Sequence, residues 1–228
     1  MTGQSTPIVL ASTSAYRAAL MQKLGIRFDQ VDPVYKEQPV EGEAPEAMAM
    51  RLAAGKALAA AQLSVTDAAS TAIFIGSDQV AHIGLQDRDH QTTSDKTSGN
   101  QTSADQTPKD QKLSKPGNFA NAAKQLQLCS GQWVTYSTAV CLVRRDGQVL
   151  SHFCERYRLR FRKLSDDLIS RYLKLDQPYD CAGSIKAEAH GIMLIEDSEG
   201  QDINTLYGLP LIRLTTELTA AGVTIPHL

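Results

Sequence analysis

Hydrophobic and polar positions along the chain switch repeatedly between strand-like and helix-like spacing. The apolar run at residues 7–12 predicts a short buried strand, and the apolar spacing over residues 15–25 predicts a helix. A second strand is expected over residues 27–33, followed by a longer helix over residues 41–63. The first third of the chain therefore favours strands connected by helices, as in α/β proteins.

The next stretch predicts longer strands. Residues 71–83 are rich in Ile, Phe and Val, and residues 76–79 are expected to interrupt that strand. A helix is expected near residues 118–129. Two long strand patterns then cover residues 132–165 around Asp146-Gly147, a strong hairpin signal.

The last part of the chain returns to helical spacing. Ser165 is expected to cap a helix that continues to residue 175. A Gly-rich turn, a strand, a polar loop and a closing helix follow over residues 179–222. Helices interleaved with parallel units and one long hairpin predict an α/β fold with a mixed sheet.

One polar segment breaks this pattern. Residues 86–112 contain a single apolar side chain, Ala104, so they cannot bury enough surface to offset the entropy of ordering them. We expect a flexible surface insertion within a single domain that spans residues 1–228. The insertion is either a mobile lid or additional length without a role, and the low entropic cost of longer loops favours the second.

Composition narrows the class of protein. The chain has 228 residues, is 42% hydrophobic and carries a net charge of −2, so no global basic field favours nucleic acid as a partner. The first residues lack the cationic and apolar regions of a secretion signal, so none is expected, and no apolar run approaches the ~20 residues that a membrane span needs. The four cysteines show no paired spacing, which indicates reduced thiols in a cytoplasmic protein.

Several polar residues stand at positions that suit chemistry. Asp78 follows an apolar run, where it is either a turn residue or a metal ligand or general base. Lys56 falls on the apolar face of its helix, so it must extend to solvent or find an anion. Glu37 lies in an acidic loop, and Lys115 precedes a proline that fixes the local backbone.

The first helix begins with a group suited to anions. Ser12 and Ser14 place hydroxyl and N–H groups at its N-terminus, and Arg17 adds a forked donor that matches phosphate. The alternative is simple N-capping by Ser14, which the preference for a hydroxyl at that position alone would explain. No phosphate-binding loop of the GxxxxGK[ST] type is present. Together these residues favour a metal-assisted reaction on a polyphosphate.

The motifs "LASTSAYR", "RLAAGKA", "IGSDQV", "KP", "CAGSIKAE" and "INTLYGLPL", in this order, resemble the Maf family of nucleotide pyrophosphatases. The resemblance covers nearly the whole chain outside residues 86–112, and it is closest to the branch that hydrolyses 7-methyl-GTP. It implies an elongated mixed-sheet fold like that of the inosine triphosphatases. It also implies a cut between the α- and β-phosphates, assisted by a divalent metal such as Mg²⁺ or Mn²⁺, in a protein that clears modified nucleotides.

The resemblance also implies roles for individual residues. Asp78 matches the proton acceptor, and Glu37 and Asp78 are expected to hold the metal. The residues that match positions tied to base choice are Tyr16, Gln79 and Glu188. The residues that match the phosphate-binding set are Ser12, Ser14, Arg17, Lys56 and Lys115. Members of the family often form homodimers, so a homodimer is an expectation; a membrane or a nucleic-acid polymer is not expected as a partner.

Two of the base-choice residues fit a methylated guanine. Its positive ring system gains a cation–π contribution of about 0.5–2 kcal/mol from stacking on an aromatic ring such as Tyr16. Glu188 is able to accept hydrogen bonds from the guanine edge. An uncharged pyrimidine would gain neither interaction.

The chain also departs from the family pattern. Ala15 replaces a usual Pro, Ala18 replaces a second Arg, Gly55 replaces a more helix-favouring residue, and Ser114 replaces a usual Gly. The loss of the Arg is the feature most compatible with a rival hypothesis, a non-catalytic nucleotide-binding regulator of cell division. A third hypothesis keeps the enzyme but assigns it other modified or canonical triphosphates, such as dTTP and UTP.

Overall fold

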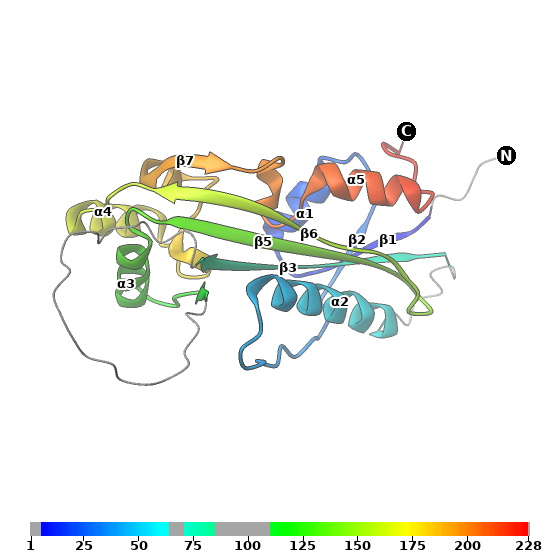
Figure 1. Cartoon of the computed structure of the whole chain (residues 1–228). Helices are drawn as coiled ribbons and strands as arrows, with labels where there is room; N and C mark the ends of the chain where they lie inside the picture. The colour runs from blue at the N-terminus through cyan, green and yellow to red at the C-terminus, as the bar shows by residue number, and fades with distance from the viewer. Residues whose placement is uncertain (1–5, 64–70, 85–109, 228) are drawn as a thin grey trace, which may run out of the picture. The chain divides into compact units, whose positions relative to one another are not determined.

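A computed structural model describes residues 6–63, 71–84 and 110–227 of the chain. Within these residues, seven strands form a mixed sheet in the order β2-β1-β3-β5-β6-β7, with β4 paired to β3 (Figure 1). The strands are β1 (Ile8–Ala11), β2 (Asp29–Val31), β3 (Ile73–Ile83), β4 (Gln111–Leu113), β5 (Trp133–Arg144), β6 (Val149–Phe161) and β7 (Ile195–Glu199). The helices are α1 (Ala15–Gln22), α2 (Pro45–Leu63), α3 (Phe119–Cys129), α4 (Asp166–Asp176) and α5 (Leu211–Ala220). The mixed α/β fold predicted from the sequence is confirmed.

The contacts of the chain divide it into two compact units. The first unit holds residues 1–80, 136–157 and 199–228, and the second holds residues 81–135 and 158–198. Strands β3, β5 and β6 contribute residues to both units. The expectation of a single domain over residues 1–228 stays a prediction.

Helices cover both faces of the sheet in the first unit. Strand β1 pairs in parallel with β2 and β3, and its side chains alternate between the two faces. Ile8 and Leu10 join a buried cluster with α1 and α5, whereas Val9 and Ala11 join a second cluster with α2 (Figure 1). The first unit is therefore a layered α/β structure with a core on each side of its strands.

Helix α2 packs unusually close to β3. Its contact face consists of small side chains, among them Ala53 and Ala57. A Cβ atom on Gly76 of β3 would lie 2.2 Å from the carbonyl oxygen of Ala53 and 2.6 Å from the backbone nitrogen of Ala57. Because no side chain fits there, Gly76 sets the short distance between helix and strand.

The second unit is built around α3 and α4. The side chain of Asn118 caps α3 by accepting from the N–H of Asn121, and Ser165 caps α4 as predicted, by accepting from the N–H of Leu168. A left-handed Gln177 ends α4.

Two boundaries differ from the sequence prediction. Strand β3 runs without interruption through residues 76–79, because Gly76 faces α2 while Ser77 and Gln79 find hydrogen-bond partners on the opposite face. The predicted polar insertion ends earlier than residue 112, since Gln111 already pairs with Ile83 in an antiparallel ladder. Residues 86–109 of that insertion lie outside the described residues. No helix among the described residues is long and apolar enough to cross a membrane.

Candidate active site

The turn from β1 into α1 brings the first three predicted phosphate-binding residues together. The Ser14 hydroxyl caps α1 by accepting from the N–H of Arg17 at 3.4 Å. The Ser12 hydroxyl accepts from the N–H of Ser14 at 3.2 Å and from Nη1 of Arg17 at 3.4 Å. Gln30 holds the same turn from β2 by donating to the carbonyl of Ser12 at 2.7 Å. Ser14 therefore caps the helix, and the same N-terminus also gathers the hydroxyl of Ser12 and the guanidinium of Arg17.

Gly208 fixes Arg17 from the C-terminal part of the chain. Its carbonyl accepts from Nε of Arg17 at 3.2 Å and from the hydroxyl of Ser77 at 2.9 Å. Gly208 has a φ of +104°, and a Cβ atom there would lie 3.2 Å from Nε of Arg17, so glycine suits the position. Sequence reasoning gave no role to Ser77 or Gly208, although Gly208 belongs to the "INTLYGLPL" motif.

Lys56 lies between two carboxylates. Its Nζ is 2.6 Å from Oδ1 of Asp78 and 2.6 Å from Oε1 of Glu37. The Lys56 and Asp78 side chains are only 14% and 12% exposed, whereas Glu37, on the loop before α2, is 49% exposed. Of the two possibilities left by the sequence, Lys56 finds an anion rather than extending freely to solvent. Asp78 lies in the middle of β3, not after its end as predicted.

Burial is the largest influence on the pKa values of Asp78 and Arg17. Desolvation raises the pKa of Asp78 above its usual range, and the nearby charges of Lys56 and Arg17 offset only part of that shift. Desolvation likewise lowers the pKa of Arg17, partly countered by Asp78 and Glu37. The Asp78 carboxylate is thus more basic than an ordinary aspartate, as a proton acceptor requires.

Glu37 and Asp78 offer two carboxylates to a hard cation, and in the structure both pair with the ammonium of Lys56. Because Glu37 and Asp78 contact the same Lys56 nitrogen, the two oxygens are at most twice 2.6 Å apart. Among the described residues, no group of three or more His, Cys, Asp and Glu side chains is placed to hold a metal. Mg²⁺ commonly uses one or two carboxylates and completes its shell with water and substrate phosphates, so this donor set suits it.

Two predicted base-choice residues lie in the same unit. Tyr16 projects from the first turn of α1 and is 45% exposed. The amide nitrogen of Gln79 donates to the hydroxyl of Thr138 at 2.8 Å and to the carbonyls of Thr205 and Leu206 at 2.9 and 3.1 Å. That nitrogen is committed within the fold, so the base-choice role of Gln79 stays a prediction that would depend on its carbonyl oxygen.

Lys115 and Glu188 belong to the second unit, and both are exposed. Gln125 of α3 connects the segments that carry them: its amide nitrogen donates to the carbonyl of Ser114 at 3.0 Å, and its oxygen accepts from the hydroxyl of Ser184 at 2.6 Å. Sequence reasoning missed Gln125, because nothing local marks a helical Gln as a bridge between two loops.

The loop before Glu188 is also anchored on α4. The N–H of Lys186 donates to the hydroxyl of Tyr172 at 2.8 Å, and its ammonium donates to the carbonyl of Asp176 at 3.0 Å. Lys186 thereby stabilises the C-terminal end of α4. Glu188 is carried by a turn that is fixed on its N-terminal side.

The structure accommodates both positions of α1 that differ from the family pattern. Ala15 is the first helical residue, a position where Pro is favoured but not required. Ala18 packs against the apolar cluster of α1 and α5. Its small side chain therefore contributes to packing where the family pattern has a cation.

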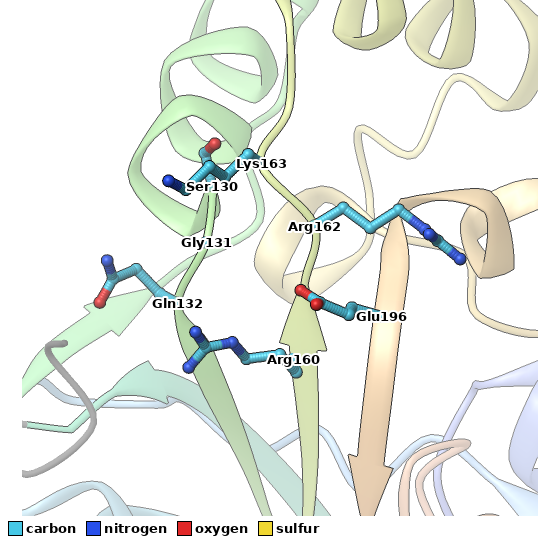
Figure 2. A pocket seen from close by; sticks show the side chains of 7 residues that line it. All are labelled: Ser130, Gly131, Gln132, Arg160, Arg162, Lys163 and Glu196. Atoms are coloured by element: carbon cyan, nitrogen blue, oxygen red, sulfur yellow. The ribbon is translucent and has the colours of Figure 1, made fainter.

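The second unit also contains a pocket of about 770 Å³ (Figure 2). Its lining includes Arg160, Arg162 and Lys163, with Glu196 on β7. None of the predicted site residues lines it, so the candidate site is the cluster around Lys56 rather than this pocket.

The comparisons with known proteins agree with the motifs. A family model for Maf-like proteins matches residues 7–221. The chain is 38% identical over 226 residues to a 7-methyl-GTP pyrophosphatase of Alcanivorax borkumensis, covering 99% of this chain and 100% of the relative. It is 40% identical over 219 residues to a protein of the same name from Nitrosospira multiformis, covering 96% of this chain and 95% of that relative. The chain therefore belongs to the Maf family, and the predicted resemblance is confirmed.

Among solved structures, the chain resembles the Ham1 protein of Staphylococcus aureus, with a TM-score of 0.47 and 13% identity over 94% of this chain and 99% of that one.

Proposed function

We propose that this chain is a nucleoside triphosphate pyrophosphatase that converts 7-methyl-GTP to 7-methyl-GMP and pyrophosphate. The observation that carries the proposal is the group of Lys56, Glu37 and Asp78, in which the Lys56 and Asp78 side chains are largely buried and burial raises the pKa of Asp78. The relatives named above and the matching motifs support the choice of reaction and substrate.

In this reaction the oxygen of a water molecule bonds to the α-phosphorus while the bond to the bridging oxygen of the β-phosphate breaks. Asp78 accepts the proton of the water. Burial raises the pKa of this carboxyl in the protein without metal. Lys56, Arg17 and the hydroxyls of Ser12 and Ser14 bind the phosphate oxygens and balance their growing charge. Lys115 is assigned to phosphate binding by the family pattern. Pyrophosphate leaves, and the monophosphate keeps the oxygen of the water.

Glu37 and Asp78 would hold a divalent cation, Mg²⁺ or Mn²⁺. When bound, such a cation polarises phosphoryl oxygens as a Lewis acid. Glu37→Gln should raise the Mg²⁺ concentration for half-maximal activity. The control Glu41→Gln, at an exposed position, should keep the wild-type value. Equal Mg²⁺ requirements in both variants would exclude Glu37 as a ligand.

Tyr16 and Glu188 are the residues we assign to recognition of the methylated base. The ring of Tyr16 is exposed on the first turn of α1, an aromatic ring stacks favourably on a cationic purine, and a carboxylate favours the same positive charge. Tyr16→Ala should therefore lower kcat/KM for 7-methyl-GTP more than for GTP. An equal loss on both nucleotides would assign Tyr16 no part in base choice.

The bond that is cut can be tested directly. Hydrolysis in ¹⁸O-labelled water should place the label in 7-methyl-GMP and none in pyrophosphate. Label in pyrophosphate, or release of inorganic phosphate, would contradict attack at the α-phosphorus.

A further inference from the structure

Helix α2 contains a notch at Gly55. Glycine is less favourable than alanine inside a helix, and the neighbouring residues of α2 are mostly alanines. A Cβ atom at Gly55 would lie 2.3 Å from Cζ and 2.5 Å from the hydroxyl oxygen of Tyr35. The ring of Tyr35 therefore occupies the space that any other side chain at position 55 would need.

An ion pair lies on the same face of α2. Arg51 lies one turn before Gly55 and makes two hydrogen bonds of 2.7 Å to the carboxylate of Glu43. Hydrogen bonding to Glu43 raises the pKa of Arg51, and the Tyr35 side chain adds a smaller contribution in the same direction. The side chain of Tyr35 thus lies close to this ion pair as well as in the notch at Gly55.

The contact between Tyr35 and Gly55 lies next to two residues of the candidate site. Tyr35 precedes Glu37 by two residues, and Gly55 precedes Lys56 by one. Glu37 lies between β2 and α2, on a segment without helix or strand, and its carboxylate still reaches Lys56 at 2.6 Å. Just before Tyr35, Val34 has a φ of +48°, an unfavourable conformation for a β-branched residue that persists only where the surroundings impose it.

We propose that Tyr35 and Gly55 are a matched pair in which the ring of Tyr35, seated in the notch at Gly55, positions Glu37 beside Lys56. Tyr35 is a positioning residue, and its effect on activity rests on the proposed function. The pair also explains why the chain has Gly55 where its family has a residue that favours helix.

Thermal stability tests the pairing without any assay of activity. With Tyr35 present, Gly55→Ala should lower Tm, because the methyl group displaces the ring. In a Tyr35→Ala background the same Gly55→Ala change should instead raise Tm by about 2–4 °C, because alanine is then only the better helix former. A rise in Tm in both backgrounds would overturn the proposed pair, as would a fall in both.

A second measurement tests the positioning of Glu37. Tyr35→Ala should raise the Mg²⁺ concentration for half-maximal hydrolysis of 7-methyl-GTP about 10-fold or more, the range seen when partners behind a metal ligand are removed. In a Glu37→Gln background Tyr35→Ala should add less than twofold, because no ligand remains to be positioned. Independent effects of the two changes would overturn the positioning role.

The proposed function and the role of the Tyr35–Gly55 pair can be refuted independently of each other. If the wild-type protein hydrolysed no nucleotide, the proposed function would fail, and the reversal of the Tm effect would still decide whether the pair exists. If the wild-type protein were active and Tyr35→Ala left its Mg²⁺ requirement unchanged, only the positioning role would be wrong.

Discussion

Gly76→Ala is expected to damage the site from a position that contacts no substrate. The added Cβ atom would lie 2.2 Å from the Ala53 carbonyl oxygen and 2.6 Å from the Ala57 nitrogen, both of them backbone atoms that cannot rotate away. Restoring an ordinary contact of roughly 3.5 Å requires α2 to move from β3 by about 1 Å. Lys56 lies on α2 and Asp78 on β3, so the 2.6 Å contact between them must lengthen.

The displacement of α2 sets the expected losses of stability and activity. Overpacking costs about 1–3 kcal/mol of folding free energy, which lowers Tm by roughly 2–12 °C in a chain of this size. A misplacement of about 1 Å in a catalytic group costs about 100-fold in rate. We therefore expect Gly76→Ala to fold at 25 °C and to lose about 100-fold in kcat/KM for 7-methyl-GTP, measured by pyrophosphate release.

Gly42→Ala is the matched control. Gly42 has a φ of +72° and no atom within 4 Å of an added Cβ, so alanine there costs backbone strain without moving α2. Its Tm should fall by a few degrees while kcat/KM stays within twofold of the wild type. A folded Gly76→Ala protein with wild-type kcat/KM would refute the geometric argument.

Four further outcomes are expected. Val34→Gly should raise Tm because glycine adopts the φ of +48° without strain, whereas the exposed Val40→Gly should not; equal shifts would contradict this account. Because burial raises the pKa of Asp78, an NMR titration of its side-chain carboxyl in the absence of divalent metal should give a pKa above the ordinary value of about 3.9, and a pKa at or below that value would disagree. Burial raises the pKa of Cys129 to about 12, so this thiol should resist maleimide at pH 8 until the protein unfolds, as fragment mass spectrometry would show. Gln125→Leu should lower kcat/KM because the loops carrying Lys115 and Glu188 lose a shared anchor, and unchanged kinetics would remove Gln125 from the site.

Local signals predicted much of the fold. Ser165 and the Asp146-Gly147 turn were placed correctly because a cap and a two-stranded turn depend on a few adjacent residues. The continuity of β3 was not predictable in that way. It depends on Ser77 bonding to Gly208, a partner 131 positions away in the sequence. A small, polar stretch inside a strand looks like a break when its distant partners are unknown.

The site shows the same division between local and distant information. The position of Lys56 on an apolar helix face predicted that it extends to solvent or finds an anion, and the structure shows the second, with Asp78 as the anion. The sequence also singled out Gly55, but only as a loss of helix propensity. Glycine suits position 55 because the ring of Tyr35 fills the space beside it. Tyr35 stands 20 residues earlier in the chain, so no periodic signal marks the contact.

The most direct test of the central claim is a pyrophosphate-release screen over canonical and methylated triphosphates with Mg²⁺ or Mn²⁺, run beside Asp78→Asn. The account predicts that the wild-type protein releases pyrophosphate from 7-methyl-GTP with a far higher kcat/KM than from dTTP or UTP, and that Asp78→Asn, still folded, loses this activity. Equal turnover of dTTP, UTP and 7-methyl-GTP would contradict the assignment of the substrate. No activity above that of Asp78→Asn on any nucleotide would contradict the enzyme itself.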